Sequence, residues 1–327
     1  MEKNILYTII TPVYNRADCI RRCMESVERS RHLLNGHGGV EHVIVDDGSS
    51  DSTRSIIEEY AKQHSHIVFV KFNHNRGTNA ARNEAIKRAQ GEWCIILDSD
   101  DYFMDNALTV ITDTMKNNSG YKHYMFAPND MQTYFQTNEI INGAKEKVIL
   151  YPDFLNGYIG GDFIHVCNTA IMRKYPFNET IRIHEGVFFL MFYREARQML
   201  FTNKTVTIRE RSRADSVTRD TIRTRDSVIN NIILSKRILL HNFEDDMINL
   251  GMSRRLNAIK TDLCENLLLM SRYSEASELH NTLKGKIPDW KYLLFTLLTL
   301  FHCGRLYKIT LQLYLNMRYN VMKKKLK

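Results

Sequence analysis

Short apolar runs and amphipathic stretches alternate along the first hundred residues. Four runs have the length and composition of strands buried on both faces: Tyr7–Thr11, His42–Val45, Ile67–Phe72 and Trp93–Leu97. Three stretches with helical spacing separate them: Ala17–Arg31, Thr53–His64 and Thr78–Ala89. This alternation predicts an α/β fold with a mainly parallel central sheet flanked by helices, because parallel strands need crossover helices between them.

The later part of the chain has a different pattern. Residues 105–215 are less regular, although Arg182–Ala196 is typical of a loop that enters a buried helix. From about Ser216 the apolar residues recur with helical spacing. We therefore predict an α/β domain over residues 1–215 and a helical C-terminal region over residues 216–327.

Polar residues follow each of the four predicted strands. The segments are Thr11–Arg16, Asp46–Ser52, Asn73–Asn83 and Asp98–Asp101. In sheets of this kind, ligands bind outside the carboxyl ends of the strands. Four such loops at one edge of the sheet predict a polar cleft.

Three carboxylates are crowded directly after the fourth predicted strand. Asp98, Asp100 and Asp101 fall within four positions, and they repel one another unless a positive group lies among them. Capping of a following helix would explain only one of the three. Mg2+ and Mn2+ prefer carboxylate oxygens and often share their coordination shell with phosphates, so we favour a divalent metal site.

Asp46 and Asp47 form a second acid pair, at the end of the second predicted strand. One of them could cap the next helix through an Asx turn. A carboxylate could equally accept hydrogen bonds from a base N–H or from ribose hydroxyls. Both interpretations stay open on these residues alone.

Composition and motifs exclude several classes of protein. A hydrophobic fraction of 43% with 25% charged residues is typical of a globular chain, and the six scattered cysteines show no metal-ligand spacing. The chain has no P-loop, dinucleotide fingerprint or nucleophile elbow. Eight basic residues after Trp290 account for the whole net charge of +8, so the body of the chain is not a nucleic-acid binder by charge.

Four motifs together carry a family resemblance. IITPVYNR, VIVDDGSSDST, NRGTNAARNEAIKRAQGEW and ILDSDD, in this order, resemble the inverting glycosyltransferases of family 2, which have the GT-A fold. The resemblance is continuous over Tyr7–Phe103 and resumes weakly around Arg182–Thr218. It implies an enzyme that uses a nucleotide-diphosphate sugar and a divalent metal, Mg2+ or Mn2+.

The resemblance also implies roles for individual residues. Those that would contact the nucleotide sugar are Pro12, Tyr14, Asp46, Asp47, Arg82, Asp98, Asp100, Arg211 and Arg213. Within this set, Asp46 or Asp47 would bind uracil or its equivalent, and Arg82 would face the base or the diphosphate. Asp100 and Asp101 would hold the metal, with Asp98 supporting them.

The catalytic base implied by the resemblance is Glu185, in the segment RIHEGVFF. In this family an acid on the acceptor side, often within a Glu-Asp pair, follows the metal motif. Here Gly186 stands where the aspartate is frequent. An ordinary loop glutamate is the alternative, but no other acid in the sequence fits a cleft-facing proton acceptor as well.

We therefore expect an inverting glycosyltransferase that moves a sugar, with UDP as the expected nucleotide, to a glycan acceptor. The implied pathway is the synthesis of a surface polysaccharide such as capsule, O-antigen or exopolysaccharide. One alternative is a catalytically inactive GT-A domain that acts as a membrane-bound interaction subunit. A nucleotidyltransferase is a second alternative, but the segment TPVYNR lacks the glycine-rich basic loop that such enzymes need.

The C-terminal tail predicts attachment to a membrane surface. Trp290–Phe301 is too short to span a bilayer but apolar enough to enter its interface, and the residues after it interleave aromatic and basic side chains. A helix that packs on the catalytic domain is the alternative. No signal-peptide pattern is present at the N-terminus. We expect a cytoplasmic protein, peripherally bound to the inner face of the cell membrane, with a lipid-linked glycan as acceptor.

Overall fold

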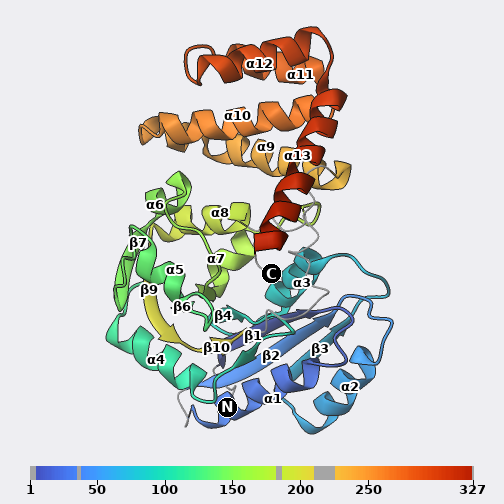
Figure 1. Cartoon of the computed structure of the whole chain (residues 1–327). Helices are drawn as coiled ribbons and strands as arrows, with labels where there is room; N and C mark the ends of the chain where they lie inside the picture. The colour runs from blue at the N-terminus through green and yellow to red at the C-terminus, as the bar shows by residue number, and fades with distance from the viewer. Residues whose placement is uncertain (1–4, 35–37, 182–185, 210–224, 326–327) are drawn as a thin grey trace. The chain divides into compact units, whose positions relative to one another are not determined.

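The computed structural model describes residues 5–34, 38–181, 186–209 and 225–325. The chain divides into two compact units, Met1–Ala214 and Asp215–Lys327. The first unit contains all the described strands, and the second is built from helices (Figure 1).

The first unit is organised around an eight-stranded sheet with the order β3-β2-β1-β4-β8-β6-β9-β7. Its parallel half contains the four predicted strands: β1 (Ile5–Val13), β2 (Gly39–Asp46), β3 (Ile67–Lys71) and β4 (Trp93–Ile96). β1 lies between β2 and β4 and is parallel to both. The prediction of a mainly parallel sheet is confirmed for this half, with strand ends within a few residues of those expected.

The other half of the sheet mixes directions and lies in the region of weak sequence pattern. Its strands are β6 (His123–Ala127), β7 (Glu146–Leu150), β8 (Ile164–Asn168) and β9 (Gln198–Thr205). β8 is antiparallel to both β4 and β6, while β9 is parallel to β6 and antiparallel to β7. A separate small sheet pairs β5 (Tyr102–Phe103) with β10 (Thr207–Ile208) in antiparallel fashion.

Helices cover both faces of the sheet. The first unit contains α1 (Ile20–His32), α2 (Thr53–Gln63), α3 (Thr78–Arg88), α4 (Ala107–Asn117), α5 (Gln132–Thr137), α6 (Tyr151–Asn156), α7 (Thr169–Lys174) and α8 (Gly186–Ala196). Side chains from α1, α2 and α4 share one buried cluster with β1 and β4. α3 packs against β1 and β2 from the opposite face (Figure 1).

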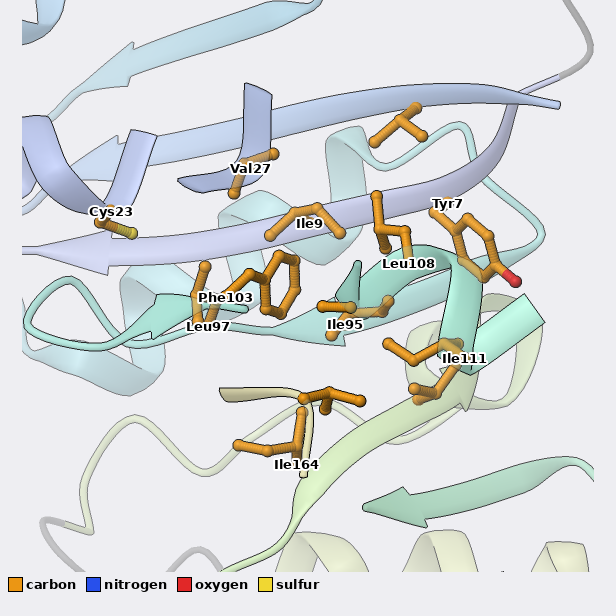
Figure 2. Packing of buried hydrophobic residues seen from close by; sticks show 14 of the residues in the cluster. Tyr7, Ile9, Cys23, Val27, Ile95, Leu97, Phe103, Leu108, Ile111 and Ile164 are labelled. Carbon is orange, nitrogen blue, oxygen red and sulfur yellow. The ribbon is translucent and has the colours of Figure 1, made fainter. Parts of the chain in front are cut away.

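The buried cluster under α1 and α4 holds the parallel strands in place. Figure 2 shows Ile9 of β1 and Ile95 of β4 directed into the same cluster as Leu108 and Ile111 of α4. Removing a large aliphatic side chain from a core of this density costs about 2–5 kcal/mol, because the cavity closes only partly. The strand ends that carry the candidate site are therefore fixed by a rigid core.

The second unit has its own helical core. Its helices are α9 (Asp226–Asn249), α10 (Ser253–Leu269), α11 (Tyr273–Asn281), α12 (Asp289–Leu300) and α13 (Gly304–Lys325). Phe295 and Leu298 of α12 are buried against Leu267 and Leu268 of α10. A side chain at Gly304 would have its Cβ 2.0 Å from the carbonyl oxygen of Leu268, so α13 starts in direct contact with α10. Within the described parts of the chain, no helix is both long and apolar enough to cross a membrane.

Candidate active site

The loops after β1 and β2 are tied together by hydrogen bonds. Asn15 has a left-handed backbone (φ 51°), and its amide donates to Ser49 Oγ at 2.9 Å. Its side-chain carbonyl accepts from the amide of Ser50 at 2.9 Å. The amide of Arg16 donates to Thr53 Oγ1 at 2.7 Å. The two loops therefore form one rigid edge of the site.

Pro12 and Tyr14, the predicted nucleotide-contacting residues of this edge, differ in exposure. Pro12 is buried within β1, opposite Val45 of β2. Its missing N–H disrupts no pairing with β4, because the last residue of β1 paired to β4 is Ile10. Tyr14 is 43% exposed and lies in the loop directly after β1.

Asp46 at the end of β2 is fully buried. Its Oδ2 accepts a hydrogen bond from Arg54 Nε at 2.8 Å, and its Oδ1 accepts from the amide of Ser49 at 3.1 Å. Arg54 also donates to the carbonyl of Phe72. Through Arg54, Asp46 therefore connects β2 with α2 and with the end of β3.

Asp47 is also buried and holds the loop after β3. Its two oxygens accept from the amides of Arg76 (2.6 Å) and Gly77 (2.9 Å). Burial raises the pKa of this carboxyl, and the two amides act in the opposite direction. Gly48 next to it has φ 75°, and a Cβ there would lie 2.5 Å from the backbone of His74. Both acids thus have structural partners, and their predicted contact with a nucleotide base stays a prediction.

The predicted acid cluster forms a turn at the end of β4. The amide of Asp101 donates to the carbonyl of Asp98 at 3.0 Å, which brings the first and last acids together. Asp98 Oδ1 lies 3.2 Å from Nη2 of Arg82, whose side chain comes from α3. The structure therefore brings together four of the residues predicted for the site: Arg82, Asp98, Asp100 and Asp101.

Asp101 is a strongly perturbed carboxyl. Burial raises its pKa to about 8, and the negative charges of Asp98 and Asp100 act in the same direction. Arg209 partly offsets this effect, while Asp130 adds to it. A divalent cation at this point would favour the charged carboxylate against both its burial and the repulsion from its neighbours.

The carboxylates at the end of β4 could hold Mg2+ or Mn2+ as a pair of ligands. Among the residues that the structure describes, no three histidine, cysteine, aspartate or glutamate side chains come together as a complete metal site. Mg2+ and related ions are commonly held by one or two carboxylates, with substrate phosphates completing the shell. Asp100 and Asp101 supply such a pair. The pKa of Asp101 is raised first by burial and then by repulsion from Asp98 and Asp100, and a bound cation would offset both effects.

Three charged residues that the sequence did not single out lie beside this cluster. Arg209 donates to Asp130 Oδ1 through Nε (2.9 Å) and Nη2 (2.7 Å), and its Nη1 lies 3.1 Å from Asp162 Oδ2. They come from three separate loops, so no local motif marks them. The one sequence feature that could have marked Asp130 and Arg209 as candidates is that each follows a short apolar run, as residues after a strand do.

Two asparagines of α3 hold the segment of residues 177–181. Asn83 accepts from the amide of Phe177 (2.8 Å) and donates to its carbonyl (2.9 Å) and to Glu179 (3.0 Å). Asn79 donates to the carbonyls of Asn178 and Ile181. The segment NAARN (residues 79–83) therefore connects α3, which carries Arg82, with residues 177–181.

Three predicted residues, Glu185, Arg211 and Arg213, lie outside the described part of the chain. The roles assigned to them as base and as diphosphate contacts stay predictions.

Comparison with known proteins places this geometry in a family. The sequence model described as Glycosyl transferase family 2 matches residues 8–180, more than half of the chain. One curated relative is the GalNAc(5)-diNAcBac-PP-undecaprenol beta-1,3-glucosyltransferase of Campylobacter jejuni, 26% identical over 215 residues. The match covers 64% of this chain and 66% of that protein.

Solved structures share the fold. TarS 1-349 of S. aureus in complex with UDP-GlcNAc aligns with a TM-score of 0.59 at 16% identity, over 80% of this chain and 81% of that one. The mannosyltransferase PcManGT of Pyrobaculum calidifontis, in complex with GDP-Man and Mn2+, aligns with a TM-score of 0.52 at 15% identity. That alignment covers 94% of this chain and 84% of the other. The predicted GT-A fold is confirmed.

Proposed function

The chain belongs to glycosyl transferase family 2, and we propose that it transfers a sugar from a UDP-linked donor to a glycan acceptor with inversion at the anomeric carbon. Family membership confirms the resemblance found in the motifs and the prediction of a glycosyltransferase. The observation that carries the proposal is the acid cluster at the end of β4, with Arg82 beside it. This arrangement suits a diphosphate together with a cation.

The donor would lie across the loops at the carboxyl ends of the parallel strands. Tyr14 is exposed there, and Arg82 presents a side chain that is 12% exposed and oriented by Asp98. Guanidinium groups bind phosphate oxygens with defined geometry. The rigid loops after β1 and β2 would hold the nucleotide, while the acid cluster faces the diphosphate.

Asp100 and Asp101 are the residues that would hold the divalent ion. When bound there, the ion supplies positive charge against the negative charge that develops on the departing diphosphate. A neighbour in the comparison, the mannosyltransferase PcManGT, contains Mn2+ together with GDP-Man. We extend the same class of cofactor, Mg2+ or Mn2+, to this chain.

The transfer itself would be a single displacement. An acceptor hydroxyl oxygen forms a bond to the anomeric carbon while the bond from that carbon to the diphosphate oxygen breaks. The hydroxyl proton passes to the carboxylate of Glu185, and the nucleoside diphosphate leaves with the electrons of the broken bond. Asn79 and Asn83 support this role, because they fix the segment that ends only a few residues before Glu185.

The acceptor that we propose is a lipid-linked glycan at the cytoplasmic face of the cell membrane. The Campylobacter relative is named for a substrate built on undecaprenol. The pathway we infer is the synthesis of a surface polysaccharide.

The second unit supports this placement through apolar side chains on its surface. On α12, Trp290, Leu293, Leu297 and Leu300 are between 43% and 68% exposed and recur at helical spacing along one face. The buried residues Phe295 and Leu298 lie on the other face.

The next helix repeats the pattern. On α13, Leu306, Ile309, Leu313 and Met317 are between 57% and 61% exposed, again spaced by three and four residues. We call these two rows of residues the outer stripes of α12 and α13. A soluble surface rarely carries so many exposed aliphatic side chains in regular rows, and such rows are typical of helices that lie in a membrane interface.

Charge complements the outer stripes. The segment from Trp290 onward has eight basic and no acidic residues. Lys291 and Lys308 pair with Glu265 and Asp226, whereas Arg305 is exposed. Each basic residue near an anionic surface contributes about 1 kcal/mol, so peripheral binding needs only a few of them.

The experiment that tests the proposed activity is incubation of the full chain with a panel of sugar nucleotides and Mn2+ or Mg2+. Donor hydrolysis or transfer is measured with and without excess chelator. We expect one or two UDP-sugars to be consumed, and only in the presence of the ion. Undiminished turnover in chelator would contradict the metal role. Donor binding without any turnover would instead support the inactive alternative.

A further inference from the structure

Residues 98–102, which we call the acid loop, are anchored by buried residues at both ends. Before the loop, Leu97 is buried, and its amide donates to the carbonyl of Ile10 in β1 at 3.1 Å. After the loop, Phe103 is buried, and its amide donates to Ser26 Oγ of α1 at 3.0 Å. Both of these apolar side chains belong to the buried cluster shown in Figure 2. The acid loop is therefore a short excursion between two fixed points.

The hydroxyl of Ser26 is oriented for its contact with the acid loop. The side chain is completely buried, and Oγ donates its proton to the carbonyl of Cys23, one turn earlier in α1, at 2.7 Å. A hydroxyl has one proton to donate and two lone pairs, so the oxygen is then left as an acceptor for the amide of Phe103. Ser26 thus fixes the end of the acid loop from a helix that is itself part of the rigid core.

The same helix also contacts the beginning of the acid loop. The thiol of Cys19, the residue before α1, lies 3.6 Å from the carbonyl oxygen of Ser99. The thiol of Cys23 lies 3.9 Å from the carbonyl oxygen of Asp98. Cys19, Cys23 and Ser26 lie on one face of the helix, because side chains three and four residues apart are neighbours. This face therefore contacts the backbone on both sides of the two predicted metal ligands.

We propose that Ser26 is a positioning residue for the divalent ion, because it fixes the backbone of the acid loop. The inference rests on the proposed function, since it assumes that Asp100 and Asp101 are the ligands. Mg2+ demands a nearly ideal octahedral geometry, so the carboxylates that bind it must be held in one arrangement. Groups that orient metal ligands without contacting the ion typically change metal affinity about 10- to 100-fold. Loss of the Ser26 hydroxyl should therefore weaken binding of the ion about tenfold.

Ser30 supplies a matched control on the same helix. It is as completely buried as Ser26, and its Oγ accepts a hydrogen bond from the amide of Leu108 at 2.9 Å. Leu108 lies in the first turn of α4, beyond the acid loop. Ser30→Ala therefore removes the same kind of hydrogen bond from the same helix, but at a place that does not hold the acid loop.

The test is titration of Mn2+ into the full chain at a fixed excess of UDP, with thermal unfolding of each variant measured without the ion. We expect Ser26→Ala to raise the Kd for Mn2+ about tenfold and Ser30→Ala to leave it within about twofold. Both substitutions should lower the unfolding temperature to a similar extent, because each removes one buried hydrogen bond. Ser26→Cys retains a weaker acceptor at the same place, so its Kd should fall between those of the wild type and Ser26→Ala.

The outcomes separate this inference from the proposed function. If Ser26→Ala and Ser26→Cys bind Mn2+ as tightly as the wild type, the positioning role is wrong and the proposed function is unaffected. The role is also wrong if Ser30→Ala weakens binding as much as Ser26→Ala, because a loss of stability alone would then explain the effect. If Ser26→Ala does not fold, Ser26→Cys decides by the same comparison. If the wild type itself fails to bind Mn2+ in the presence of UDP, the proposed metal site is wrong, and the role of Ser26 is wrong with it.

Discussion

Arg82 of α3 and Asp98, two residues beyond β4, form an ion pair with 3.2 Å between Nη2 and Oδ1. The same helix carries Asn79 and Asn83, which hold residues 177–181. One helix therefore positions both the acid cluster and the segment that approaches residue 185.

Asn83→Ala should lower the rate of transfer about tenfold while leaving donor affinity within about twofold. The substitution removes three hydrogen bonds to Phe177 and Glu179, so the acceptor-side segment loses its anchor. Turnover at saturating donor and the Kd for UDP-sugar are the measurements. Glu84→Ala, on the same helix and paired with Arg88 one turn away, is the control. Equal losses in both quantities would show that Asn83 acts on the donor site.

Asp101→Asn should abolish Mn2+-dependent donor binding without unfolding the protein. The raised pKa of Asp101 means that the folded state binds more protons than the unfolded state between pH 4 and pH 8. Wild-type stability attributable to this group therefore falls as pH rises through that window, and the variant should lack this decline. Mn2+ titration and thermal unfolding at pH 6 and pH 8 test both statements. Asp105→Asn, an exposed acid four residues on, is the control. Unchanged Mn2+ affinity in Asp101→Asn would remove this residue from the metal site.

Glu185→Gln should retain donor affinity and lose transfer by about two to four orders of magnitude, the usual contribution of a general base. The amide has the same shape as the carboxylate but cannot take the acceptor proton. Donor Kd and single-turnover transfer separate the two effects. A loss of affinity with unchanged transfer per bound donor would instead make Glu185 a binding residue.

Acid should destabilise the first unit through buried histidines. Burial lowers the pKa of His42 to about 3 and that of His66 to about 4, from an ordinary value of 6.5. Below pH 6.5 the unfolded chain takes up protons that the folded chain cannot, so the free energy of unfolding falls as pH falls. At pH 5 the loss from His42 is about 2 kcal/mol, and that from His66 is smaller because Glu28 lies 3.2 Å from its ring.

His42→Asn tests this effect, because asparagine does not titrate. The difference in unfolding free energy between pH 7.5 and pH 5 should shrink in this variant, and His241→Asn on the exposed side of α9 should leave it unchanged. Denaturant unfolding measures both. An unaltered pH dependence in His42→Asn would mean that another group causes the acid sensitivity.

The outer stripe of α12 should be needed for membrane binding. In flotation with anionic liposomes at low salt, the full chain should rise with the lipid, and Leu293→Ser/Leu297→Ser/Leu300→Ser should not. Full burial of each leucine contributes about 1.5–3 kcal/mol. Ile248→Ser/Leu250→Ser, which alters exposed apolar residues elsewhere in the second unit, is the control. These substitutions are preferable to deletion of the tail, because α12 also supplies Phe295 and Leu298 to the helical core. If the wild-type chain stays at the bottom of the gradient, the proposed binding to a membrane surface is wrong.

The parallel half of the fold could be predicted because β1, β2 and β4 are buried on both faces, and the half-buried edge strand β3 is also a continuous apolar run. The half of the sheet that contains β6 to β9 could not be predicted in this way. All five residues of β6 are buried, but β7 exposes four of its five and follows a helix of only six residues. Their pairing depends on strands far away in the sequence, which local patterns do not encode.

The residues of the candidate site also differ in how far they could be predicted from the sequence. Asp98, Asp100 and Asp101 could be found because they are adjacent in sequence. Arg209 and its two partner acids converge only in the folded chain. For Asp46 and Asp47 the sequence showed that acids were present, but it could not show that Arg54 and two loop amides meet them. Local motifs do not encode interactions between single residues from separate loops.

The position of β8 governs the order in which the sheet can be assembled. β8 lies between β4 and β6, although it follows both in the chain. During synthesis, the facing edges of β4 and β6 therefore remain unpaired until Ile164–Asn168 has emerged, long after β4. Long-range pairing of this kind slows folding and leaves strand edges open to association with other chains. Fragments that end before β8 should aggregate, and slower translation across residues 97–163 should lengthen the time during which the nascent chain needs a chaperone.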